Sequence, residues 1–174
     1  MIVNYARDQA GAEQVVREIT GNGGRAIAVQ GDVAQRSDAQ CLVAEAKKAF
    51  GRLDVLVNNA GVFSFAPSEQ FSEQEFHRQF NTNVLGTFLM MEAALPAFGV
   101  EGGSIINIGS TASVAAYPTL SIYVASKSAV NGLTRVLSKS SAPEKSALTL
   151  SIPVEPKRRV RTRRASWERS LRSR

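Results

Sequence analysis

The stretch LDVLVNNAG, residues 53–61, joins an apolar run to a polar turn that contains glycine. A short apolar run that is bounded by such a turn is typical of a strand inside a sheet. In open α/β sheets, ligands bind outside the carboxyl ends of the strands. The stretch therefore predicts a strand whose carboxyl end, residues 58–61, opens onto a site.

Strands and helices alternate on both sides of this stretch. Further apolar, strand-like runs occupy residues 2–5, 26–29 and 104–110, and helical patterns occupy residues 10–20, 37–50, 72–97 and 121–138. Ser37 is the predicted cap of the second helix and Gly51 its end, while Ser72 and Glu75 form a capping-box pattern for the third. This alternation, with short connections, predicts an α/β fold with a parallel sheet that is covered by helices on both faces.

Polar side chains follow the predicted strands where a site is expected. Asp32, the residues 58–61 and Ser110 all stand at carboxyl ends. Because the carboxyl ends of parallel strands meet at one edge of the sheet, we expect these residues to lie near one another.

The composition fits one ordinary domain and places the basic charge in one segment. The chain has 174 residues, and its 44% apolar content excludes a wholly disordered protein. From Ser140 onward, ten Lys and Arg residues face three Asp and Glu residues, a balance of +7, whereas the whole chain carries +6. Residues 1–139 are therefore nearly neutral, and the basic character belongs to residues 140–174 alone.

The single cysteine and the single histidine carry little chemistry. Cys41 alone forms no disulfide framework, and we expect it to be buried or half-buried in a reducing compartment. His77 is expected on a helix surface, and no metal site is predicted. No apolar run approaches the length of a membrane span, and no signal peptide precedes residue 2, so we expect a cytoplasmic protein without a membrane partner.

Tyr123 and Lys127 stand four residues apart on the last predicted helix, so their side chains share one face. A tyrosine hydroxyl, with a pKa of about 10, is a poor acid–base group at neutral pH. A neighbouring ammonium favours the phenolate and brings the pKa of the tyrosine toward the working range. The alternative interpretation is an exposed tyrosine and a solvated lysine.

Two more residues strengthen the catalytic interpretation. Ser110 ends a predicted strand thirteen residues before Tyr123, where its hydroxyl could donate to a substrate oxygen. Asn83 lies inside a predicted helix, where asparagine has poor propensity and needs a reason, although a surface asparagine is the plain alternative. The order and placement of Asn83, Ser110, Tyr123 and Lys127 make them candidate catalytic residues.

Residues 1–139 resemble the short-chain dehydrogenase/reductase family, and within it the 3-oxoacyl-[acyl-carrier-protein] reductase-like members. The motifs that carry the resemblance are GDV at 31–33, NNAG at 58–61, NTNVLGTF at 81–88, IINIGS at 105–110 and YVASKSAVNGLTR at 123–135. The resemblance implies a Rossmann-type doubly wound parallel sheet. It also implies hydride transfer between NADP(H) and a carbonyl or secondary alcohol, as in a 3-oxoacyl-thioester reductase or a glucose dehydrogenase.

The same resemblance assigns roles to the candidate residues. Tyr123 would transfer the proton, Ser110 would orient the carbonyl or alcohol, and Asn83 would hold a water in the proton relay. Lys127 would lower the pKa of Tyr123 and bond the nicotinamide ribose. The residues implied at the cofactor, besides Tyr123 and Lys127, are Asp32 and Val33 beside the adenine and Asn58, Asn59, Ala60 and Gly61 along the cleft.

The residues after the first predicted strand bear on the choice of cofactor. Non-phosphorylated dinucleotides are held by an acidic residue on the ribose hydroxyls, whereas an arginine suits a 2′-phosphate. Arg7 follows the strand directly and Asp8 comes one step later. We therefore favour NADP(H) with Arg7 as the phosphate contact; NAD(H) with a solvated Arg7 is the alternative.

The sequence departs from the family pattern at both ends. The glycine-rich T-G-x-x-x-G-x-G turn and its strand are not among the 174 residues, and Met1 enters at what resembles the second strand of the family. Because the first strand is central in the family's sheet, we expect an incomplete sheet with a gap between two halves, and weak cofactor binding.

Residues 140–174 are expected to be a non-native, disordered basic tail that replaces the last strands of the family. A one-base shift of the reading frame would let the codons of residues 146–154 spell I-R-V-N-S-I-N-P-G, a family-like segment. The tail is thus interpreted as out of frame after about Lys139.

Three functional interpretations follow. The first is an oxidoreductase with a small-molecule carbonyl or alcohol substrate, and family members of this kind are commonly homotetramers. The second is a catalytically inactive fragment of the same family. The third and weakest is a nucleic-acid-binding protein that acts through its arginine-rich tail, which lacks interleaved aromatic residues beyond Trp167; we expect no nucleic-acid partner.

Overall fold

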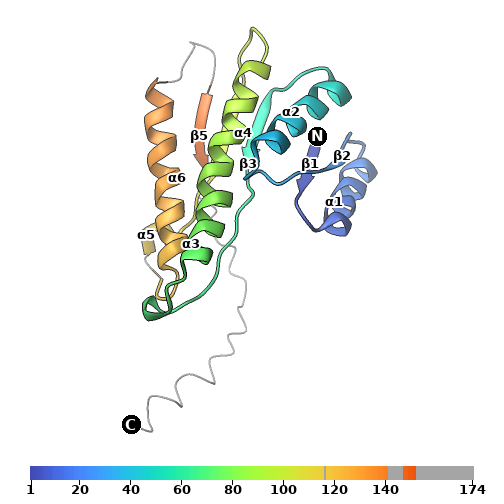
Figure 1. Cartoon of the computed structure of the whole chain (residues 1–174). Helices are drawn as coiled ribbons and strands as arrows, with labels where there is room; N and C mark the ends of the chain where they lie inside the picture. The colour runs from blue at the N-terminus through green and yellow to red at the C-terminus, as the bar shows by residue number, and fades with distance from the viewer. Residues whose placement is uncertain (116, 141–146, 152–174) are drawn as a thin grey trace.

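The computed structural model describes residues 1–115, 117–140 and 147–151 (Figure 1). In chain order the elements are β1 (Ile2–Tyr5), α1 (Gln9–Gly21), β2 (Ile27–Gln30), α2 (Arg36–Phe50), β3 (Val55–Asn58), the 3-10 turn η1 (Ser68–Gln70), α3 (Glu73–Phe80), the π-helical turn η2 (Asn81–Leu85), α4 (Gly86–Ala94), the 3-10 turn η3 (Leu95–Ala97), β4 (Ser104–Ile108), α5 (Ala112–Ala115), α6 (Ser121–Ser140) and β5 (Ala147–Ser151).

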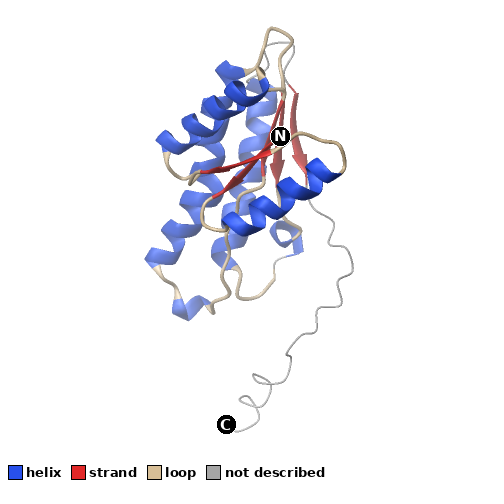
Figure 2. Ribbon diagram, turned by 90° about the vertical axis from the view of Figure 1, so that its right-hand side faces the viewer, coloured by secondary structure: helices blue, strands red, loops and turns tan. Residues whose placement is uncertain are grey.

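The strands form two parallel sheets. β1 pairs with β2, with Ile2 opposite Ile27, and the second sheet has the order β3-β4-β5, with Leu56 opposite Ile105. Within the described residues, β1 and β3 do not pair with each other. The predicted α/β fold and the predicted interruption of its sheet are both confirmed, and Figure 2 shows helices on both sides of the strands. The expected helix cover is incomplete over β3, where Val55 and Val57 are 50% and 51% exposed.

Helix α2 connects the two half-sheets through one apolar core. Its buried residues recur at helical spacing, at Ala39, Leu42, Val43 and Ala46. The core they enter contains Leu56 of β3 and Ile105 of β4, with partly buried Ile2 of β1 and Val29 of β2 packed against it. Figure 1 shows α6, α4 and α2 in one layer in front of β5 and β3. Full burial of a Leu or Val side chain contributes about 1.5–3 kcal/mol, so the contacts of Leu42 and Val43 help to hold the two half-sheets together.

The predicted helix over residues 72–97 is present but not uniform. It divides into α3, the π-turn η2, α4 and η3, which follow one another without a gap. At the start of α4, Gly86 lies so close to Val33 that an added Cβ would stand 2.7 Å from the Val33 side chain. Glycine is needed there because α4 approaches the residues after β2 closely.

The helix caps agree only in part with the predictions. Ser72 Oγ accepts from Glu75 N at 3.3 Å, and Gly51 ends α2 with a φ of 78°, both as predicted. The predicted cap Ser37 is wrong, because α2 begins at Arg36 after Gln35, which makes no side-chain cap. The neighbouring Asp38 instead accepts from Asp32 N at 2.9 Å, which ties the end of β2 to the start of α2.

Strand β5 corrects the expectation for the start of the tail. Residues 140–174 were expected to be disordered and to replace the last strands, yet Ala147–Ser151 pairs in parallel with β4 along its whole length. From Leu148 on, apolar residues alternate with hydroxyl residues, a period-two pattern that suits a strand. Residues 141–146 and 152–174, and the predicted arginine-rich stretch with them, lie outside the described residues.

The two isolated reactive residues lie on helix surfaces. Cys41 is exposed, which corrects the expectation of burial: it falls between the buried positions of α2 and faces solvent. His77 lies on α3 as predicted, with Nε2 3.5 Å from a carboxylate oxygen of Glu73. No described helix is long and apolar enough to cross a membrane.

Candidate functional site

The side chain of Asn83 is buried at the centre of the site, with 1% of its surface exposed. Its Nδ2 donates to Val62 O at 2.9 Å and to Ser126 Oγ at 2.9 Å, and its Oδ1 accepts from Val62 N at 2.8 Å. The surface-asparagine alternative is therefore excluded. The amide satisfies both backbone groups of Val62 at once and joins the segment after β3 to α6.

The π-helical turn η2 carries Asn83 in its middle. Such turns are rare and interrupt the regular α-helical bonding, and they occur often at functional sites. The Asn83 carbonyl is not left unpaired, since Thr87 Oγ1 donates to it at 2.9 Å. The turn thus gives a local reason for an asparagine inside a long helix.

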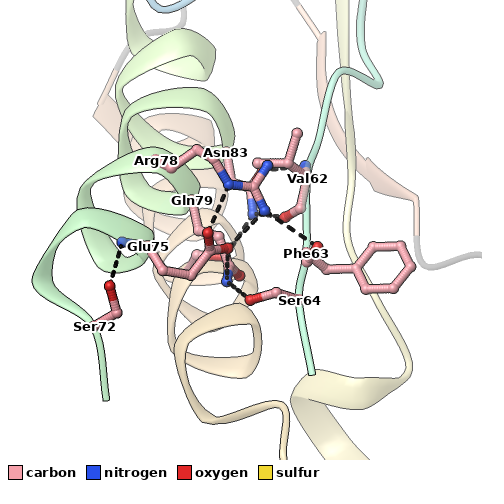
Figure 3. A network of polar contacts seen from close by, with 9 residues as sticks. Val62, Phe63, Ser64, Ser72, Glu75, Arg78, Gln79 and Asn83 are labelled. Carbon is pink, nitrogen blue, oxygen red and sulfur yellow. Dashed lines mark hydrogen bonds and ion pairs between the residues drawn. The ribbon is translucent and has the colours of Figure 1, made fainter. Parts of the chain in front are cut away.

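Residues 62–66, which follow β3, are held by further polar contacts from α3 (Figure 3). Arg78 Nη2 donates to Phe63 O at 3.3 Å, and Gln79 Nε2 donates to Ser64 Oγ at 3.0 Å. On the far side, Ala66 N donates to Thr119 O at 2.9 Å. Segment 62–66 is therefore fixed from η2, from α3 and from the loop before α6.

Glu75 completes this network. Its carboxylate accepts from Arg78 Nε at 2.8 Å and from Arg78 Nη2 at 2.6 Å, a paired geometry, and from Gln79 Nε2 at 2.8 Å. The hydrogen bonds from Arg78 hold the pKa of Glu75 at about 2, with further lowering from Ser64. The same contact raises the pKa of Arg78. The guanidinium of Arg78 is thus committed to its own helix and to Phe63.

Lys127 lies buried under the end of β4. Only 5% of its surface is exposed, and its Nζ donates to Ile108 O at 2.8 Å. Burial lowers the pKa of the Lys127 ammonium below its usual value, because desolvation disfavours the charged form. A Cβ added to Gly61 would stand 3.5 Å from Lys127 Nζ and 3.4 Å from Asn83 Oδ1, so the NNAG turn, η2 and α6 meet at this point.

Tyr123 lies one helical turn before Lys127 and is linked to Asn83 through its backbone. Ser126 Oγ donates to Tyr123 O at 2.8 Å and accepts from Asn83 Nδ2. The half-buried Tyr123 ring packs on Phe63, with ring centroids 5.7 Å apart. Among the described residues, the Tyr123 hydroxyl has no hydrogen-bond partner.

Ser110 follows β4, at the carboxyl edge that the sequence predicted. Its Oγ accepts from Ala112 N at 3.2 Å. The Ser110 hydroxyl proton makes no hydrogen bond to another described residue, which leaves it free to donate.

The other predicted site residues are more dispersed. Arg7 and Asp32 are exposed at the ends of β1 and β2, on the other half-sheet, and Val33 is buried in the core. Asn59, Ala60 and Gly61 are exposed after β3, but the Asn58 side chain is directed to the sheet, where Nδ2 donates to Asn107 Oδ1 at 2.8 Å. In the described residues no group of three or more His, Cys, Asp or Glu side chains is placed to hold a metal ion.

Several residues of the network were missed in the sequence. Ser126 and Gln79 are fully buried, and Asn107 is buried in mid-strand, where its Nδ2 donates to Thr134 Oγ1 at 2.9 Å. For Asn107, its place as a polar residue inside the apolar run SIINIGS could have indicated a buried hydrogen-bonding role. Arg78 and Gln79 carry no such signal, because charged and amide residues are ordinary on a helix.

This geometry can be compared with that of known proteins. The family model for short chain dehydrogenases matches residues 1–154. The chain belongs to the short-chain dehydrogenase/reductase family. The match extends through β5, and the 3-oxoacyl-[acyl-carrier-protein] reductase-like subtype is not distinguished by it.

The relatives of this short-chain dehydrogenase/reductase are longer than the chain itself. An uncharacterized oxidoreductase of Methylorubrum extorquens is 47% identical over 153 residues, which cover 88% of this chain and 61% of that protein. A dehydrogenase/reductase from Sinorhizobium meliloti 1021 superposes with a TM-score of 0.80 at 33% identity, over 86% of this chain and 59% of the other. The chain thus spans about three-fifths of the length of these relatives.

Two further crystal structures of short-chain dehydrogenases contain a nicotinamide cofactor. That from Burkholderia cenocepacia J2315, in complex with NADP, has a TM-score of 0.79 at 31% identity, over 86% of this chain and 61% of the other. That from Burkholderia phymatum, in complex with NAD, has a TM-score of 0.78 at 29% identity, over 86% and 55%.

Replacing Asn83 tests whether its amide holds segment 62–66. The Asn83→Ala change removes three hydrogen bonds and leaves partly buried groups of Val62 unpaired, so we expect the free energy of unfolding to fall by about 2–3 kcal/mol. Chemical denaturation followed by circular dichroism measures this. Asn81→Ala, at an exposed position of the same turn, is the matched control and should change stability by less than about 0.5 kcal/mol. Equal losses in both variants would contradict the assigned role.

Proposed function

We propose that this chain carries the catalytic half of an NAD(P)-dependent oxidoreductase site that interconverts a carbonyl compound and a secondary alcohol. The observation that carries the proposal is the buried Lys127 ammonium, which lies beside Gly61 and belongs to the helical turn of α6 that follows Tyr123. The dehydrogenase/reductase names of the relatives and the nicotinamide cofactors in two neighbours support the same reaction class.

In the proposed reaction, Tyr123 is the acid–base group. Its hydroxyl donates the proton as the carbonyl oxygen becomes an alkoxide, and accepts it in the reverse direction. The free Ser110 proton orients the substrate oxygen. When bound, the reduced nicotinamide would supply the hydride.

The contacts of Asn83 favour a positioning role over a direct one. Both of its Nδ2 protons are committed, to Val62 O and Ser126 Oγ, and Oδ1 already accepts from Val62 N. The side chain thus keeps little capacity to bind a relay water. We propose that its role is to fix the position of the NNAG turn relative to Tyr123. This narrows the relay role that the family resemblance implied.

The residues present fit part of a dinucleotide. Lys127 uses one ammonium proton for Ile108 O and keeps two for ribose hydroxyls, and Gly61 presents bare backbone beside it. On the other half-sheet, Asp8 is committed to capping α1, since its Oδ1 accepts from Gly11 N at 2.9 Å. The exposed Arg7 side chain has no partner among the described residues and suits a 2′-phosphate, so we favour NADP(H) over NAD(H).

The pyrophosphate is the part that residues 1–174 do not serve. No glycine-rich turn that opens a helix stands before Arg7 in this sequence, and backbone donors of that kind hold the pyrophosphate in dinucleotide sites. A homotetrameric assembly is proposed from the family resemblance alone, and a cytoplasmic location from the sequence alone.

Removing one hydroxyl tests the catalytic assignment. Tyr123→Phe should lower the rate of NADPH oxidation with a ketone panel at least a hundredfold, because general acid catalysis contributes on that scale. Ser128→Ala, which removes an exposed hydroxyl from the same helix, is the control and should keep the rate. Equal rates for both variants would exclude Tyr123 as the acid. A wild-type chain that binds NADPH without any turnover would establish the inactive-fragment alternative.

Cofactor choice is tested at Arg7. Arg7→Ala should weaken NADPH binding about tenfold in a calorimetric titration and leave NADH binding nearly unchanged, because only NADPH offers a 2′-phosphate to the guanidinium. Arg17→Ala on the exposed face of α1 serves as the control and should affect neither. Equal losses for the two cofactors in Arg7→Ala would contradict the assignment of Arg7.

A further inference from the structure

Segment 62–66 presents two aromatic rings to solvent. Phe63 is 57% exposed and Phe65 is 68% exposed, whereas the alternate positions Val62, Ser64 and Ala66 are half-buried. This alternation follows from an extended backbone, in which successive side chains point to opposite sides. Single exposed apolar residues are ordinary on protein surfaces and carry no inference by themselves.

The two rings form a continuous aromatic surface with the proposed acid. The centroids of Phe63 and Phe65 are 5.6 Å apart with an interplanar angle of 88°, an edge-to-face pair. Phe63 also packs on Tyr123, at 5.7 Å and 56°. Three contacting rings therefore run from solvent to Tyr123, whose hydroxyl is the proposed acid.

The backbone beneath the rings is fixed rather than loose. Asn83 bonds both backbone groups of Val62, Arg78 bonds Phe63 O, and Ala66 N bonds Thr119 O. Thr119 has a φ of 68°, a left-handed conformation that is unfavourable for a β-branched residue. Strain of this kind persists only where the surroundings enforce it, and it is common at ligand sites. The fold thus uses a buried polar network to hold two exposed rings in place.

Charge beside the rings excludes one class of recognition. Arg78 is the cation that reaches segment 62–66, and its guanidinium is paired with Glu75. No other described cation hydrogen-bonds to segment 62–66. The segment therefore offers no unpaired positive charge to a phosphate or carboxylate group of a ligand. What the surface offers is the flat, apolar face of aromatic rings.

We propose that Phe63 and Phe65 bind the aromatic ring of the substrate, so that the site selects aryl ketones and aryl carbinols over straight-chain ones. The inference rests on the proposed function for the position of the reacting carbonyl at Tyr123. The ring binding itself requires no turnover. Because the Phe63 ring packs on the Tyr123 ring, a substrate ring stacked on Phe63 would hold its attached carbonyl close to Tyr123.

The test uses three methyl ketones of equal carbon count on the full 174-residue chain: acetophenone, cyclohexyl methyl ketone and 2-octanone. Binding is measured by saturation-transfer NMR titration, with no cofactor required. We expect acetophenone to bind most tightly. The double variant Phe63→Leu/Phe65→Leu should weaken acetophenone binding about tenfold and remove its advantage over the other two ketones, since leucine keeps the apolar surface but not the ring.

Two controls separate this inference from the proposed function. Phe71→Leu, at a 63% exposed ring that packs on Phe76 instead, should leave acetophenone binding unchanged. Tyr123→Phe keeps the ring and should also bind acetophenone, even though it abolishes turnover. Aryl selectivity without turnover in the wild-type chain would refute the proposed function and uphold the aryl site. Equal binding of the three ketones, no binding, or indifference to the Phe63/Phe65 change would overturn the aryl site.

Discussion

The bond between the Asn83 amide and the Val62 backbone is the contact on which the rest of the site depends. It replaces the strand pairing that segment 62–66 lacks after β3, and it reaches Tyr123 through Ser126. Because the amide is buried, losing it would leave polar groups without compensation in a medium of low dielectric constant. One side chain on a π-turn thus positions the NNAG turn, the proposed acid and the two exposed rings together.

A second constraint acts at the scale of the sheet. The proposed adenine-side residues Arg7 and Asp32 follow β1 and β2. Ser110 follows β4, and Lys127 of α6 donates a hydrogen bond to Ile108 O of β4. No strand hydrogen bonds join β1 to β3 in the described residues, so the relation of the two groups depends on the apolar contacts of α2. Apolar packing of this kind is dense, but it lacks the directionality that hydrogen bonds give to a β-ladder. A ligand that spans both halves would therefore add to the stability of the fold as well as occupy the site.

The sequence predicted the frame of the molecule well and its polar interior poorly. Strand and helix positions follow from periodicity, so β1 agrees with its predicted bounds and α6 nearly so, and the gap in the sheet followed from the family's strand order. Ser37 failed as a cap because Asp38 and Gln35 shape that turn through contacts with β2. Cys41 and Arg78 show the general limit. The burial of a helical side chain and its hydrogen-bond partners depend on which face of the helix packs against other elements. The local sequence does not determine this.

The most direct test of the central claim is native-state hydrogen exchange at the Val62 amide. With Asn83 Oδ1 accepting from it at 2.8 Å, the Val62 amide should be protected to nearly the same degree as the amides of β4. In Asn83→Ala that protection should vanish at Val62 and fall at Ala66, while the amides of β1 and β2 lose no more protection than the loss of global stability accounts for. Rapid exchange at Val62 in the unaltered chain, or unchanged protection in the variant, would contradict the account.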